Sequence, residues 1–201
     1  MKKVLFAVLS VIVCACHEPS QKVTYYEQHD NCQEMKILDS AMSIDKYVYK
    51  GDDDYDLAAA LKLHHECSVE LAQYEMEHAK NAVMKQIASA ILENDKHELL
   101  VIDSFLNNYK PVSTISGNYA EVKRTIDKMQ HTADLQLIKD NNDYDFAILI
   151  LPQRQCGIDL ADMIVHNCQS PFLKQLAETI DQNETVEIET LQQWLLKNKL
   201  R

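Results

Sequence analysis

The chain has 201 residues and a formal net charge of −11, with no cluster of lysine or arginine side chains. Because binding to a nucleic-acid backbone requires cations that neutralise phosphates, this composition argues against a nucleic-acid partner. Only three glycines and four prolines are present, which argues against a turn-rich β fold. The abundance of Ala, Leu, Glu, Lys and Gln in the periodic segments favours helices.

Residues 1–15 have the pattern of an export signal. Two lysines precede the apolar stretch Val4–Val13, which is shorter than the roughly 20 residues that span a bilayer. The segment that ends at Cys16 resembles the lipobox of bacterial lipoproteins. This implies that Cys16 is the lipidated first residue of an exported chain, anchored to a membrane on the periplasmic side of the envelope. The alternative is an ordinary signal peptide cleaved nearby, with Cys16 an incidental thiol.

The next segments lead from a tether into helices. Residues 16–32 are polar and irregular and are interpreted as a tether between lipid and domain. From Gln33 to Tyr49 the apolar residues fall near helical spacing and predict a first helix. Acidic residues within 51–54 then mark a helix entry, because their side chains accept hydrogen bonds from free backbone N–H groups. A second helix is predicted over residues 55–79.

A third helix is predicted from Ala82 to Tyr109. It begins after Asn81, a good N-cap residue, and ends before Pro111, which cannot continue a helix. The second and third helices therefore form one long helical hairpin. Residues 111–117 link this hairpin to the second half of the chain.

The second half repeats the first at a constant offset. Residues 54–106 align without a gap onto residues 143–195, and 14 of the 53 aligned positions are identical, where composition alone gives roughly three. A constant register over this length indicates a duplicated structural unit, with repeat 1 over residues 33–110 and repeat 2 over residues 111–201. The matching short helix of the second copy is predicted over residues 119–139.

The second copy also predicts a hairpin. Its last helix runs from Pro171 to about Lys199, after the N-cap residue Ser170. One hairpin buries little apolar surface by itself, but two hairpins related by a pseudo-two-fold axis bury each other's apolar faces. The sequence therefore predicts an all-α fold, in which duplicated helical hairpins form a four-helix bundle with two additional shorter helices.

The copies differ most clearly at His64-His65, where the second copy carries Gln153-Arg154. Any imidazole chemistry of the first copy is therefore absent from the second. This excludes a bundle with two equivalent histidine sites.

Four cysteines follow Cys16, and export makes disulfides permissible. Cys67 and Cys156 are equivalent in the two copies, so a pseudo-two-fold axis could bring them together. With Cys32 and Cys168 they allow three complete pairings, and the sequence does not choose between these and buried free thiols.

The helical segments carry a pattern of short motifs that is found in both copies. It resembles the family called domain of unknown function 305, which implies a ferritin-like fold of helical hairpins. The motifs that carry the resemblance are Asp54-Tyr55-Asp56-Leu57-Ala58, Leu63-His64-His65-Glu66-Cys67, Leu71-Ala72, Gln86-Ile87-Ala88, Glu98-Leu99 and Phe105-Leu106, together with Asp143-Tyr144-Asp145-Phe146-Ala147, Leu160-Ala161, Leu176-Ala177, Glu187-Ile188 and Trp194-Leu195.

Some members of this family are linked to copper or other metals outside the cytoplasm. The resemblance implies that copper or another transition metal would bind at His64 and His65, with Asp56 as a further candidate ligand. Adjacent histidines on a helix point about 100° apart, so one metal rarely takes both. A ligand from another helix is then required, and Glu98 or Glu187 could supply it.

Two observations leave the metal site open. Methionines often stand beside the histidines of the family, and their thioethers select Cu(I). Leu61, Leu71 and Ile102 occupy the corresponding positions here. The alternative is that the histidines are structural, with one imidazole hydrogen-bonded across the bundle.

The sequence contains no nucleophile–base arrangement, glycine-rich phosphate loop or zinc-type cysteine spacing, so it argues against an enzyme. Two functions remain open. One is an envelope-anchored binding protein that sequesters or senses a transition metal through repeat 1. The other is a structural or protein-interaction lipoprotein whose histidines are incidental.

Overall fold

The computed structural model describes residues 29–112 and 118–198. The predicted signal, the lipidation site at Cys16 and most of the predicted tether lie outside the described residues. No helix in the described part of the chain is long and apolar enough to cross a membrane.

The described residues form helices and contain no β-strand. In chain order the elements are α2 (Gln33–Ala41), a short 3₁₀ helix η1 (Ile44–Lys46), α3 (Asp53–His78), α4 (Ala82–Asn108), α5 (Asn118–Asp134), α6 (Asn142–Asn167) and α7 (Pro171–Lys197). The predicted all-α class is confirmed.

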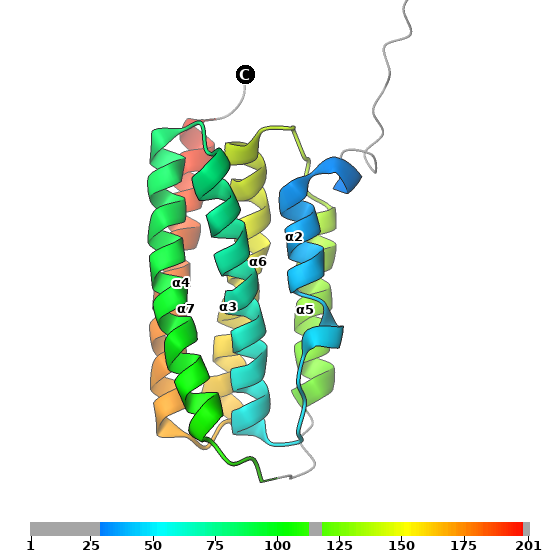
Figure 1. Ribbon diagram of the computed structural model, residues 1–201, viewed down its shortest axis with the longest axis vertical. Coiled ribbons are helices and arrows are strands. Elements are labelled where there is room, and N and C mark those ends of the chain that lie inside the picture. The colour runs from blue at the N-terminus through cyan, green and yellow to red at the C-terminus, as the bar shows by residue number, and fades with distance from the viewer. Residues whose placement is uncertain (1–28, 113–117, 199–201) are drawn as a thin grey trace, which may run out of the picture.

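The helices form a bundle of three layers (Figure 1). The hairpins α3–α4 and α6–α7 make the four-helix bundle, in which α3 packs against α6, while α4 and α7 meet at far fewer points. The shorter α2 and α5 cover the other side of α3 and α6. Since α3 and α6 are covered on both sides, most of their circumference is buried, and polar side chains on them lie in the interior.

The two hairpins match in length and in capping. Helices α3 and α6 each have 26 residues, and α4 and α7 each have 27. The side chains of Asp52 and Asn141 cap α3 and α6 by accepting from Tyr55 N and Tyr144 N. The predicted caps of the following helices are confirmed, because Asn81 accepts from the first turn of α4 and Ser170 from that of α7.

The first predicted helix, over residues 33–49, is wrong in its second half. The chain leaves the helix after Ala41, passes through η1 and is extended at Tyr47. There the Tyr47 hydroxyl donates to the Asp56 carbonyl (3.1 Å), and its ring stacks on that of Tyr119 with centroids 5.9 Å apart. A continued helix would lose these contacts. The helix predicted over residues 119–139 ends at Asp134.

The bundle interior is apolar along most of its length. Leu71 and Leu160, at equivalent positions, are both fully buried, as expected for two hairpins that share one core. The positions corresponding to methionines in the family pattern are all fully buried aliphatic residues: Leu61, Leu71, Ile102, Ile150, Leu160 and Leu191. One layer between α3, α4, α6 and α7 interrupts this core with polar side chains.

Candidate metal centre

The polar layer is an ionisable cluster in the interior of the bundle, named the polar centre below. It consists of His64 and His65 on α3, Asp95 and Glu98 on α4, Gln153 and Arg154 on α6, and Glu184 and Glu187 on α7. All of these residues except Glu187 are buried, and four of them have no solvent-exposed surface: His64, His65, Gln153 and Arg154. Buried charges of this kind are stable only when they are paired or bind an ion.

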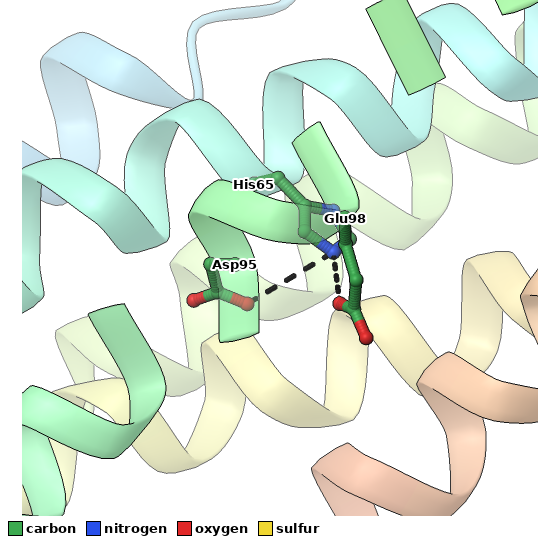
Figure 2. A group of neighbouring side chains, drawn as sticks. All are labelled: His65, Asp95 and Glu98. Carbon is green, nitrogen blue, oxygen red and sulfur yellow. Dashed lines mark hydrogen bonds and ion pairs between the residues drawn. The ribbon is translucent and has the colours of Figure 1, made fainter. Parts of the chain in front are cut away.

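His65 is the residue around which candidate metal ligands converge. Its Nε2 lies 2.8 Å from Glu98 Oε2 and 3.9 Å from Asp95 Oδ1 (Figure 2). One ligand atom from each of the three residues lies within 4.8 Å of the others. The contact with Glu98 is the one anticipated for a ligand on another helix. Asp95 was not anticipated.

The second nitrogen of His65 fixes the orientation of the ring. His65 Nδ1 lies 2.9 Å from the Leu61 carbonyl oxygen and donates to it. In the neutral imidazole the lone pair is then on Nε2, directed at the two carboxylates. This arrangement, with one nitrogen anchored to the backbone, is the usual one for a histidine that binds a metal.

The carboxylates keep His65 protonated in the metal-free protein. Burial alone would lower the pKa of His65, but the hydrogen bond to Glu98 and the negative charge of Asp95 raise it to about 9. The pKa of Asp95 is lowered, because Arg154 and His65 offset the effect of its burial. His65 and Asp95 therefore form a charged pair at neutral pH.

Arg154 stands in the second hairpin where His65 stands in the first. Its Nη1 and Nη2 lie 3.1 and 2.7 Å from the two oxygens of Asp95, so the guanidinium binds this carboxylate in bidentate fashion. It also reaches Glu184 (3.0 Å) and Glu187 (3.3 Å), and it contacts the Ser68 hydroxyl. A permanent cation thus fills the second half of the polar centre.

His64 faces a different part of the polar centre. Its ring is inclined by 76° to that of His65, and its Nε2 lies 2.6 Å from Glu184 Oε1. Gln153 donates to the His64 carbonyl (3.0 Å). Burial lowers the pKa of His64 and raises that of Glu184 to about 8, so the two groups share one proton. His64 is hydrogen-bonded across the bundle and is not in the group formed by His65, Asp95 and Glu98.

Asp56, the third predicted ligand, stabilises the loop that precedes α3 and the first turn of that helix. Its carboxylate accepts from the backbone N–H groups of Lys50 (2.7 Å), Gly51 (2.9 Å) and Asp52 (2.9 Å). It precedes His64 by eight positions, which is about 12 Å along a helix. Asp145 holds the equivalent loop before α6 in the same way. The structure therefore does not bring Asp56 together with the histidines.

The polar centre contains more carboxyl groups than cationic side chains. Its carboxyl groups are those of Asp95, Glu98, Glu184 and Glu187, and Arg154 is the one permanent cation among its members. Three buried oxygen atoms of the polar centre, Glu184 Oε2, Gln153 Oε1 and Glu187 Oε2, have no hydrogen-bond partner among the described residues, although Glu187 Oε2 is ion-paired with Arg154 Nε. The arrangement can therefore accept further positive charge, either as protons or as a metal ion.

The sequence did not lead to the prediction of Asp95 and Glu184 as members of the polar centre, although it contains a pattern that points to them. Asp95 and Glu184 stand at positions of the two hairpins that align with each other in sequence, and both are acidic. Asp95 lies one helical turn before Glu98, and Glu184 one turn before Glu187, so each is on the same helix face as that glutamate. Acidic residues that recur in register on a buried face would have identified them.

The four cysteines within the described residues form no disulfide. Cys32, Cys67, Cys156 and Cys168 are free and buried. Burial raises the pKa of each thiol. Of the readings that the sequence left open, the arrangement corresponds to buried thiols that fill the core.

Comparisons with known proteins agree with this fold. No curated protein matches the chain. Solved structures with a similar fold include CopM in the Cu(I)-bound form, in the Cu(II)-bound form and in the Ag-bound form obtained by soaking. Each has a TM-score of 0.55 and 18% sequence identity, and the match covers 72% of this chain and 96% of CopM. The family model for the domain of unknown function DUF305 matches residues 54–195, and the chain belongs to that family.

Proposed function

We propose that this protein binds one divalent transition-metal ion, of the Cu(II) or Zn(II) class, at His65, Asp95 and Glu98. The observation that carries the proposal is the convergence of an imidazole nitrogen and two carboxylates in the bundle interior. The similarity in fold to CopM, whose structures hold copper or silver, supports a metal-binding role.

The donor atoms decide the class of ion. One imidazole nitrogen and carboxylate oxygens suit borderline and hard divalent ions, whereas Cu(I) prefers thioethers and thiolates. The methionine positions of the family pattern are aliphatic here, and the buried thiols are not in the group around His65. The site therefore fits Cu(II) or Zn(II) and does not fit Cu(I).

The charge of the polar centre also favours a divalent ion. The polar centre has four carboxyl groups and one permanent cation, Arg154, so its carboxyl groups outnumber its fixed positive charges. A divalent ion would replace the proton on His65, so its binding is coupled to proton release. The unpartnered oxygen of Glu184 marks the same need for positive charge.

We also propose that the protein acts outside the cytoplasm as a lipoprotein anchored through Cys16, and that it arose by duplication of one hairpin unit. The sequence pattern that ends at Cys16 supports the first point. The equal helix lengths and equivalent caps of the two hairpins support the second.

Calorimetric titration of the purified protein tests the metal site. We expect one equivalent of Cu(II) or Zn(II) to bind in the micromolar range or tighter, and Cu(I) to bind no better than to an unrelated acidic protein. His65→Gln and Glu98→Gln should abolish this binding. His166→Ala is the matched control, because His166 lies on α6 with a side chain that is 68% exposed. Wild-type protein that binds no divalent ion would refute the proposal.

One observation favours a second function. Arg154 already binds both oxygens of Asp95, so the polar centre can serve as a permanent ion-pair network that fixes the alignment of the hairpins. In that case the protein is a structural or interaction module of the envelope. The titration above separates the two functions, because only the first predicts stoichiometric binding that depends on His65.

A further inference from the structure

The polar centre comes close to the protein surface on one side. Within the ionisable groups around His65 and Arg154, the side chains of Glu98 and Glu187 are 7% and 12% exposed, whereas those of Asp95 and Glu184 are 2% exposed. Glu98 belongs to α4 and Glu187 to α7. The opposite side of α3 and α6 is covered by α2 and α5.

A groove lies over this side of the polar centre, between α4 and α7. Its volume is about 370 Å³, and its polar lining includes Asn94, Asn183 and Glu187. Its walls are largely apolar, with Val83 and Val186 more than half exposed. Solvent can therefore reach Glu187 from the groove without separation of the helices.

Two asparagines stand between the groove and the carboxylates. Asn183 Nδ2 donates to Glu98 Oε1 (2.9 Å), and Asn94 Nδ2 donates to Glu187 Oε1 (3.3 Å). The two residues occupy equivalent positions in the copies, and each binds the glutamate of the other hairpin. These amides are neutral donors, so they can turn away from the carboxylates without leaving a charge unpaired.

We propose that this groove is the entrance through which hydrated divalent metal ions reach the polar centre, and that Asn94 and Asn183 form its gate. Asn183 has a second role as a positioning residue. Its hydrogen bond occupies Glu98 Oε1 and leaves Glu98 Oε2, which faces His65, for the ion. The inference rests on the proposed metal site, but the route can be tested without metal.

The apolar walls and the small volume define what can enter. A hydrated metal ion fits the groove, whereas a bulky chelator does not and would have to release its metal ion outside. The groove therefore favours delivery as an aqua ion or from a weakly held small complex.

A tryptophan at the groove tests the route. Val186→Trp places a large ring over the entrance, and Leu100→Trp is the matched control, because Leu100 is a 70% exposed residue on α4 that does not line the groove. In stopped-flow mixing with aqueous Zn(II), Val186→Trp should slow association about tenfold or more with unchanged stoichiometry. Leu100→Trp should leave the rate unchanged. Equal rates in both variants and the wild type would overturn the route.

A metal-free measurement keeps this test independent of the proposed function. In the metal-free protein, NMR can measure the exchange of the His65 ring N–H protons with solvent. This exchange should be slower in Val186→Trp than in Leu100→Trp. Unchanged exchange would refute the entrance whether or not any ion binds. Failure of metal to bind, with slowed exchange, would refute the metal site alone.

The asparagines provide a matched pair for the positioning role. Asn183→Ala should weaken Zn(II) affinity about tenfold or more, as is usual when a partner of a ligand is removed. Asn94→Ala, which frees Glu187 instead of Glu98, should change the affinity much less but should accelerate association and dissociation to a similar degree. Equal losses of affinity in the two variants would show that Asn183 does not position Glu98.

Discussion

His65 and Arg154 occupy equivalent positions in the two hairpins and face the same carboxylate. His65 Nε2 lies 3.9 Å from Asp95 Oδ1, and Arg154 Nη2 lies 2.7 Å from Asp95 Oδ2. In one half of the polar centre the positive charge is on His65, which loses it by releasing a proton. In the other half it is on Arg154, whose charge is permanent. A metal ion can replace the first but not the second, which is why we expect one site in a bundle of two similar halves.

Loss of the permanent cation should destabilise the protein and increase its dependence on metal. Arg154→Gln leaves Asp95, Glu184 and Glu187 without their buried partner, so we expect the free energy of unfolding to fall by about 3–5 kcal/mol. Because the polar centre of this variant has no permanent cation to balance its carboxylates, Zn(II) should raise the Tm of the variant more than that of the wild type. Urea unfolding and thermal melts with and without Zn(II) provide the measurement.

The control for this variant is Arg124→Gln, because Arg124 has an exposed side chain paired with Glu121 on the surface. Its stability should match that of the wild type. An Arg154→Gln variant as stable as Arg124→Gln would contradict the assignment of Arg154 as the cation that holds the acidic cluster.

Gly157 should resist substitution although it lies inside a helix. A Cβ at this position would overlap the carboxylate of Glu184, which His64 and Arg154 hold in place. Alanine usually stabilises a helix by about 1 kcal/mol relative to glycine, but displacement of Glu184 should outweigh this gain. We expect Gly157→Ala to lower the free energy of unfolding by about 1–3 kcal/mol, measured by urea unfolding; a more stable variant would show that Glu184 moves freely.

Glu75 should make the protein less stable as the pH rises. It is fully buried, and its carboxyl oxygens have no hydrogen-bond donor facing them among the described residues, whereas the protonated carboxyl can donate to Asp143. Burial and the nearby negative charge of Asp143 raise its pKa from 4.5 to about 9. Because the folded state holds the proton more tightly than the unfolded state, stability is lost as the pH rises from about 4.5 to 9.

Glu75→Gln should therefore be more stable than the wild type at pH 8, by about 1–3 kcal/mol, and equal to it near pH 4. Thermal melts over this pH range provide the measurement. Glu77→Gln is the control, since Glu77 is exposed on the same helix. Parallel pH profiles for Glu75→Gln and the wild type would contradict the burial of a protonated carboxyl at this position.

Metal binding should depend on pH through His65. Its pKa in the metal-free protein is about 9, so a proton competes with the ion throughout the neutral range. Zn(II) affinity should rise with pH between about 6 and 9, and protons should be released on binding. Titrations in buffers of different ionisation enthalpy count these protons, and an affinity independent of pH would exclude His65 as a ligand.

The hairpins were predictable because local signals agree with the tertiary structure. Apolar spacing defined α3 and α4 to within about two residues, and the capping side chains of Asn81 and Ser170 fixed the second helix of each hairpin. The end of α2 was not predictable from local signals. Tyr47 leaves the helical pattern for contacts with Asp56 and Tyr119, which are distant in sequence or on another element.

The polar centre was predictable only in part. The spacing of Glu98 allowed a contact with the histidines, and the structure places it against His65. Asp56 was a candidate ligand only through the family resemblance. An acidic residue at a helix entry can bind either an ion or backbone amides, and only the three-dimensional fold of the loop decides between them. The role of Arg154 required knowledge of the buried carboxylates around it.

The most direct test of the metal site is electron paramagnetic resonance of the protein loaded with one equivalent of Cu(II). We expect a type 2 spectrum with coupling to one imidazole nitrogen, which His65→Gln removes and His64→Gln retains. Copper that binds without imidazole coupling, or a signal that survives in His65→Gln, would contradict a metal site built on His65.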